Sequence, residues 1–193
     1  MKKLNFVLLG ALMLLFYSCT NSNVRTALKD ANNPAVQLHL IDSILNCGEL
    51  LHIDIYEIGE LKSIEVSVQS VQVGDISLQY INFRKDCSDS YRYHSWEEAK
   101  LTPAECPYLL SAIDTIKANF ERTTDHEERY AYITKDDIRL LSFNKGGDDW
   151  TSTLSVDYKK DNSRIYFWDE EDFDSLRTLI QNSLNKIDEL NKK

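Results

Sequence analysis

Two stretches of the chain, residues 51–96 and 130–168, consist of short segments in which apolar and polar residues alternate. Alternation with a period of two places the apolar side chains on one face of a β-strand, so each stretch predicts a series of half-buried strands. Turn-forming residues separate the segments, among them Lys145-Gly146-Gly147-Asp148 and Lys160-Asp161-Asn162-Ser163. Short turns of this kind join antiparallel strands, because parallel strands need a long crossover connection. The chain is therefore expected to form antiparallel sheets.

The expected strands are residues 51–56, 64–68, 76–83 and 91–96, then 130–134, 138–143, 150–158 and 164–168. Three segments with helical spacing of apolar residues surround them. The first begins after Asn33-Pro34, a capping side chain followed by a proline that suits the first helical position. The second follows Thr102-Pro103-Ala104-Glu105, which has the form of a capping box, or begins at Pro107. The third, from Phe173 to Leu190, has an acidic first turn, as the helix dipole favours.

The resulting order is α-β4-α-β4-α, which predicts that residues 32–193 form one α+β domain with amphipathic helices packed on antiparallel sheets. Each block of strands ends in a tryptophan and an acidic pair before a helix: Trp96-Glu97-Glu98, then Trp168-Asp169-Glu170. This repetition suggests an internal duplication, with residues 50–120 and 130–190 as the two halves. In each half, the amphipathic helix is expected to cross one face of the sheet, with the tryptophan packed beneath it.

The N-terminus has the order of an export signal. Lys2 and Lys3 precede a mainly apolar segment from Leu4 to Phe16, and the small residue Ser18 stands before Cys19. The apolar segment is shorter than the roughly 20 residues that a membrane-spanning helix needs. Residues 1–18 are therefore predicted to be a cleaved signal peptide.

The residues Leu15-Phe16-Tyr17-Ser18-Cys19 resemble the lipobox of bacterial lipoproteins. The resemblance implies a diacylglyceryl thioether on Cys19 and acylation of its new amino group, which attach the protein durably to a membrane. Residues 19–31 would then be a lipidated tether. Neither an aspartate nor an acidic run follows Cys19. The expected location is the bacterial cell envelope, at the periplasmic face of the outer membrane.

The charge of the chain argues against nucleic acid as a partner. The formal net charge is −9, and loss of Lys2 and Lys3 with the signal leaves 20 basic against 31 acidic residues, or −11. Such a chain repels phosphate backbones and anionic lipid headgroups. The membrane is expected to be reached through the lipid on Cys19 alone.

Three cysteines follow Cys19, and an odd number allows at most one intramolecular disulfide among Cys47, Cys87 and Cys106. If one forms, we expect it to join Cys87 to Cys106, because both flank a turn–strand–turn segment while Cys47 ends a helix. The alternative for all three is packing as small buried hydrophobic residues.

No compact catalytic motif is present: there is no GxSxG elbow, and the six glycines are scattered rather than gathered in a phosphate loop. Cys106, near a helix N-terminus, is the best available nucleophile, with His94 or His126 as its base. A pair of carboxylates that catalyses hydrolysis is a second alternative. The acidic runs 125–128 and 169–172 lack the spacing of known metal sites, so neither a metal nor a cofactor is expected.

Aromatic residues recur at alternate positions of three expected strands and suggest flat platforms for sugars or peptides. The alternative is that strands favour aromatic side chains and bury them. The candidate ligand-binding residues are Tyr91, Tyr93, Tyr130, Tyr132, Tyr166 and Trp168. The sequence thus favours a non-enzymatic binding module for an envelope protein or a glycan. The competing hypothesis is a small envelope hydrolase that uses an acidic pair or a Cys–His pair.

Overall fold

The structure is a computed structural model of the chain and describes residues 33–46, 48, 50–73, 76–87 and 95–192. The predicted signal at residues 1–18, Cys19 and the tether up to residue 31 lie outside the described residues. None of the described helices is both long and apolar enough to cross a membrane.

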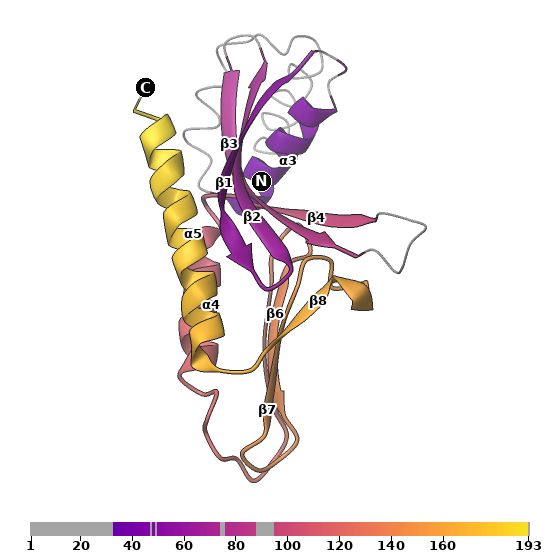
Figure 1. The fold of residues 1–193 in the computed structure, drawn as a ribbon, viewed down its shortest axis with the longest axis vertical. Helices are drawn as coiled ribbons and strands as arrows, with labels where there is room; N and C mark the ends of the chain where they lie inside the picture. Colours follow the sequence, from indigo (N-terminus) through magenta and orange to yellow (C-terminus); the bar gives the residue numbers. More distant parts are fainter. Residues whose placement is uncertain (1–32, 47, 49, 74–75, 88–94, 193) are drawn as a thin grey trace, which may run out of the picture.

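Two four-stranded sheets and three described helices make up the fold (Figure 1). Helix α3 (Pro34–Leu45) precedes the first sheet, which comprises β1 (His52–Leu61), β2 (Ile64–Val73), β3 (Ile76–Asp86) and β4 (Trp96–Leu101). Helix α4 (Cys106–Lys117) leads to the second sheet, which comprises β5 (Glu128–Ile133), β6 (Arg139–Asn144), β7 (Trp150–Ser155) and β8 (Arg164–Phe167). A 3-10 turn, η1 (Asp161–Ser163), precedes β8, and helix α5 (Glu170–Leu190) follows it. Within each sheet, every strand pairs antiparallel with its neighbour in sequence, so the predicted α+β class and order are confirmed.

The β6–β7 connection shows why local residues decide these hairpins. Gly146 and Gly147 have φ angles of 101° and 109°, a left-handed region that residues with a Cβ avoid. The side-chain oxygen of Asn144 accepts a hydrogen bond from the Gly146 N–H at 2.6 Å and closes the turn. The turn predicted at residues 145–148 is confirmed.

Helices α4 and α5 lie against each other and pack on one shared core (Figure 1). Helix α5 crosses β1, β2 and β3 of the first sheet and touches β8, whereas α4 lies on β5 and β6 of the second sheet. Each helix therefore packs chiefly on the sheet of the other half. The expectation that each helix covers the sheet preceding it in sequence is wrong, because an apolar stripe determines that a helix must be buried but not against which sheet.

Close approach of α5 to the first sheet depends on Gly59. Residue pairing between β1 and β2 shifts between Glu57 and Gly59, which marks a β-bulge. A Cβ atom at Gly59 would lie 2.8 Å from the Cδ2 atom of Leu179 on α5. A side chain at position 59 would therefore have to displace the end of the Leu179 side chain, and glycine lets the helix lie close to this edge strand without that shift.

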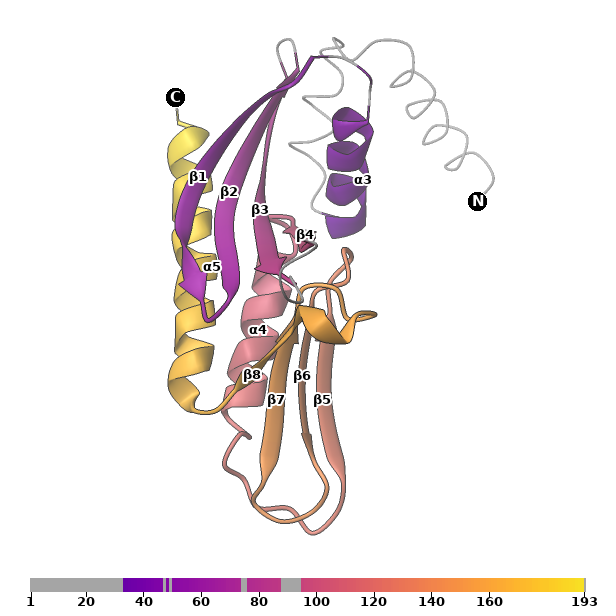
Figure 2. The same cartoon turned by 45° about the vertical axis from the view of Figure 1, so that its right-hand side comes forward.

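Helix α3 covers the opposite face of the first sheet, so that this sheet lies between α3 and α5 (Figure 2). Ile41 and Ile44 of α3 pack on Val71, Leu78 and Tyr80. The cap predicted at Asn33 is present, since its side chain accepts a hydrogen bond from the Ala35 N–H at 3.0 Å.

The segment before α4 differs from its prediction. The fourth strand is Trp96–Leu101 rather than residues 91–96, of which 91–94 lie outside the described residues. Thr102 does not cap α4, which starts at Cys106 with Pro107 in its first turn. The sequence also allowed a start of this helix at Pro107. Residues 96–101 form a strand whose Ala99 and Leu101 side chains point into the core.

Neither tryptophan before an acidic pair packs beneath a helix. Trp96 is 42% exposed and its ring lies 3.8 Å from the guanidinium carbon of Arg84, while Trp168 is 75% exposed. The ring that meets α5 is Phe167, whose centroid lies 4.9 Å from that of Phe173. Because side chains alternate along a strand, the core-facing position falls one residue earlier than predicted.

The proposed Cys87–Cys106 disulfide is absent, because both residues are buried free thiols. The Sγ atom of Cys87 lies 3.5 Å from the carbonyl oxygen of Asn162, and that of Cys106 lies 3.4 Å from the carbonyl oxygen of Thr102. The two thiols therefore point into different surroundings, and each packs as a small apolar residue. Cys47 lies outside the described residues.

Candidate functional site

Cross-strand pairing divides the second sheet into two faces. One face packs under α4 and contributes Leu140 and Leu154 to the core. The other consists of eleven residues in three rows: Arg129–Phe143–Thr151, Ala131–Leu141–Thr153–Tyr166 and Ile133–Arg139–Ser155–Arg164. Among the described helices none packs on this side, and Figure 2 shows α4 between α5 and the strands of this sheet. We call these eleven residues the open face.

The open face is basic although the chain as a whole is acidic. It carries Arg129, Arg139 and Arg164 and no carboxylate, whereas the net charge of the chain is −9. Glu127 and Asp161 at its rim pair with Arg129 and Arg164 at 2.6 and 2.9 Å. Both of these acids are well exposed, and exposed ion pairs hold little free energy. This face therefore suits an anionic ligand better than the rest of the molecule does.

Apolar side chains surround the arginines on the open face. Ile133 is 46% exposed and Tyr166 is 43% exposed, while Leu141 and Phe143 are half-buried. An uncovered sheet face that mixes apolar and cationic groups is typical of a binding surface rather than of a solvated one.

Tyr166 and Trp168 form a stacked aromatic pair at the edge of the open face. Their ring centroids lie 5.7 Å apart with an interplanar angle of 21°. Lys62, in the β1–β2 turn, donates to the carbonyl oxygen of Tyr166 at 2.7 Å and to Asp172 at 2.8 Å, which ties the first sheet to this segment. The sequence had placed these two rings on one strand face, and the structure brings them into contact.

Tyr130 and Tyr132 lie on the other face of the sheet, below α4. They are half-buried, and with Tyr108 they line a pocket of about 470 Å³ between α4 and β5. The Tyr130 ring lies 5.7 Å from that of Trp150. The structure thus separates this pair from Tyr166 and Trp168, while Tyr91 and Tyr93 lie outside the described residues.

Glu105 is a buried carboxylate beside the same tyrosines. It is 2% exposed, and its Oε1 atom accepts from the Lys135 N–H at 2.9 Å and from the Tyr132 hydroxyl at 3.4 Å. Burial raises the pKa of Glu105, and burial with the nearby Glu105 raises the pKa of Tyr132. These bonds join the start of α4 to the β5–β6 turn, which is a structural role.

The geometry of Cys106 does not favour nucleophilic catalysis. The residue is fully buried, and burial raises the pKa of its thiol to about 12, so the reactive thiolate is disfavoured. His126 lies in the loop between α4 and β5 and is largely exposed, and a hydrogen bond to Asp125 raises its pKa. His94, the other base considered, lies outside the described residues.

The acidic run 169–172 caps α5. The Asp169 side chain accepts from the Asp172 N–H at 3.1 Å, and Asp172 accepts from the Trp168 N–H at 2.7 Å. The described part of the chain contains no group of three or more His, Cys, Asp or Glu residues placed to hold a metal ion. The carboxylates of this run therefore serve the helix N-terminus.

A second hollow, of about 450 Å³, lies between α3, β3 and the end of α5, with Leu78, Leu184 and Ile187 among its lining residues. It borders the part of β3 beyond its pairing with β4, which begins at Ile81. The described residues that line this hollow include no aromatic or cationic side chain, unlike those of the open face.

Arg139, Arg164, Leu141 and Phe143 were not among the residues predicted to bind a ligand. Their alternation was visible in the sequence, but it assigns residues to two faces without telling which face a helix covers. Only the position of α4 identifies the uncovered one.

Comparison with known proteins gives no match, whether with protein-family models, with curated protein sequences or with solved structures.

Proposed function

We propose that this chain is a lipid-anchored protein of the bacterial cell envelope whose domain binds a glycan or an envelope protein through the open face. The observation that carries the proposal is the exposed Tyr166–Trp168 stack beside an uncovered, basic sheet face. The anchor rests on the sequence before Cys19, and the binding role rests on the geometry of β5 to β8.

The stack is suited to contact a ligand without a large rearrangement. Trp168 is 75% exposed although an exposed indole gains nothing for folding, and Lys62 lies 6.0 Å from its ring centroid. The hydrogen bond from Lys62 to Tyr166 holds the backbone below the rings in place. A rigid aromatic surface binds with a small entropic cost, because little must be ordered on association.

The competing hydrolase hypothesis lacks this kind of support. Cys106 is buried, and burial raises the pKa of its thiol. Asp114 and Glu170 line one pocket, but Asp114 pairs with Arg177 and Glu170 pairs with Lys117.

The proposal is tested by binding of the mature chain to an array of envelope polysaccharides, together with photo-crosslinking in cells from position 133, an exposed position of the open face. We expect a glycan signal or a protein adduct that Trp168→Ala or Tyr166→Ala abolishes. Tyr108→Ala is the matched control, because Tyr108 is a 58% exposed aromatic residue on α4, away from the open face. Equal loss in the control, or no signal in either assay, would contradict the proposal.

A further inference from the structure

We propose that Arg139, Ser155 and Arg164 form a subsite for a carboxylate, and that the ligand of the open face is a saccharide bearing uronic acid groups. This inference rests on the function proposed above and names the ligand class for the same face.

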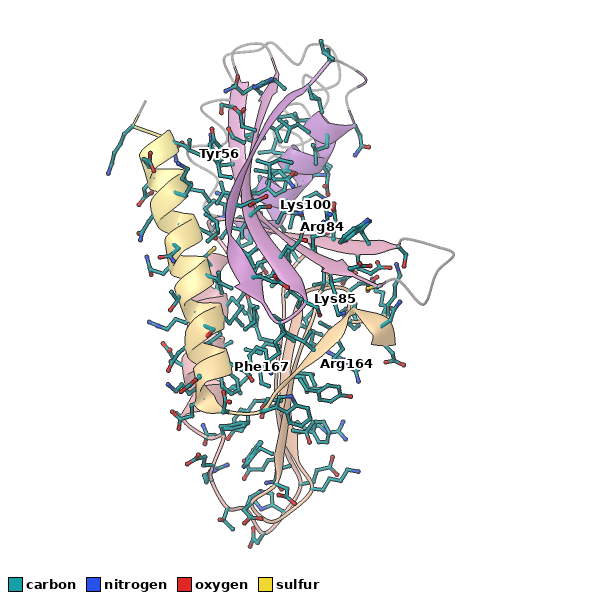
Figure 3. The ribbon with its side chains drawn as sticks, viewed as in Figure 1. Tyr56, Arg84, Lys85, Lys100, Arg164 and Phe167 are labelled. Carbon is teal, nitrogen blue, oxygen red and sulfur yellow. The ribbon has the colours of Figure 1, made fainter. Side chains whose placement is uncertain are left out.

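The three residues form one row across neighbouring strands. Arg139 of β6 pairs with Ser155 of β7, and Ser155 pairs with Arg164 of β8. The two arginines therefore flank the serine from both sides, with Cα atoms about 10 Å apart, or two strand spacings. In Figure 3 Arg164 lies on the side of β8 away from α5, opposite to Phe167. One small anion can thus lie between two guanidinium groups.

Several buried donors in this region have no hydrogen-bond acceptor among the described residues. They are Arg139 Nε, Arg164 Nε, Ser155 Oγ and Thr153 Oγ1. Ser155 and Thr153 are 0% and 2% exposed, and Thr153 occupies the next row of the same face. Buried donors are normally satisfied, so four unsatisfied ones in neighbouring rows suggest a ligand whose carboxylate displaces the covering arginine side chains and accepts from these donors. All four can donate, and a carboxylate only accepts.

The charges of the arginines support the same ligand. Arg139 forms no ion pair with any described residue, and its guanidinium carbon lies 5.5 Å from the Tyr158 ring centroid. Among the residues that the structure describes, Arg164 has one carboxylate partner, Asp161, whose side chain is 96% exposed. Two like charges on one row repel each other, and an anion between them removes the repulsion and binds in the bidentate geometry that guanidinium favours.

The stacked rings indicate a saccharide rather than an acidic peptide. Tyr166 follows Arg164 by two residues on β8, so the two side chains emerge from the same face about 7 Å apart. A sugar unit packed against the exposed surface of this aromatic pair can therefore place a carboxylate substituent over Arg164.

The test measures binding of residues 20–193 by titration calorimetry to trisaccharides of galacturonate, glucuronate and mannuronate. Each is used as the free acid and as the methyl ester, beside a neutral galactan trisaccharide and a tri-glutamate peptide. We expect at least one free acid to bind and its ester to bind at least tenfold more weakly. Arg139→Gln and Arg164→Gln should each weaken binding at least tenfold. Arg177→Gln, on α5 away from the open face and paired with Asp114, should change it less than twofold.

Equal affinity for acid and ester, or tighter binding of tri-glutamate, would overturn the inference. Binding of the neutral trisaccharide alone would overturn it while leaving the proposed function intact. A complete lack of binding, combined with failure of the array and crosslinking assays, would remove both. Because loss of an unsatisfied buried donor should not harm folding, Arg139→Gln should unfold at or above the wild-type temperature. Unfolding well below that temperature would instead assign Arg139 a structural role and overturn the inference.

Discussion

Truncation of Ile180 to alanine tests whether the two halves share one core. Ile180 lies in the middle of α5, is fully buried and belongs to a cluster with residues of both sheets, including Val68 and Leu154. Removing a buried isoleucine side chain to the β-carbon costs about 2–5 kcal/mol, from lost transfer free energy and the cavity that remains. For a domain of this size, that loss lowers the unfolding midpoint by roughly 4–20 °C.

The assay is thermal and urea unfolding followed by far-UV circular dichroism and by tryptophan fluorescence. Variants that keep Trp96 alone or Trp150 alone report on the first and the second sheet, so a shared core predicts one coincident transition that moves as a whole. Asn182→Ala is the matched control, because Asn182 is an exposed residue of the same helix and should shift stability by less than about 0.5 kcal/mol. A loss below about 1 kcal/mol in Ile180→Ala would show that α5 is not a core element. Separate transitions for the two probes would show that the halves fold independently.

Three further outcomes are expected. Burial raises the folded-state pKa of Glu105, so its ionisation lowers stability as pH rises from its unfolded pKa through its folded pKa. Glu105→Gln should remove that decline, so the urea midpoint of the variant should rise relative to that of the wild type as pH rises. Midpoints that change with pH in the same way in both proteins would contradict this prediction. Cys87 and Cys106 should resist a maleimide in the native state and react in urea without reductant, whereas a bridged peptide in non-reducing mapping would contradict the structure. Cells fed an alkyne fatty acid should label wild type but not Cys19→Ala, and a labelled variant would refute lipidation at that residue.

Local interactions explain which parts of this fold could be predicted from the sequence. The hairpin turn at Gly146 and Gly147 depends on backbone conformations that few other residues adopt, and the Asn33 and Asp169 caps depend on atoms within three residues. The stripe on α5 is similarly local, and its predicted residues Phe173, Leu176 and Ile180 are buried. The element order and the antiparallel pairing followed from these signals, since short turns leave adjacent strands no other partner.

The candidate site was predictable only in part. The spacing of Tyr166 and Trp168 indicated an aromatic pair, and the structure stacks the two rings. The same reasoning grouped Tyr130 and Tyr132 with them, although these two residues lie below α4. The alternation of residues along a strand assigns each residue to one of two faces, but it does not tell which face a helix covers.

Tertiary structure alone decided that α5 covers the first sheet and α4 the second, and this exchange determines which side of β5 to β8 remains open. No local signal specifies which sheet each helix covers, because burying the apolar stripe of a helix on either sheet gives a similar free energy per unit area. The outcome depends on long-range fit, such as the approach of Leu179 to the bulge at Gly59. The sequence by itself therefore determined the elements, their order and the residues that each strand turns to its two sides. The packing of the helices then decided which of those sides became core and which was left as a basic, aromatic surface, because burial is a property of the assembled chain and not of any one segment.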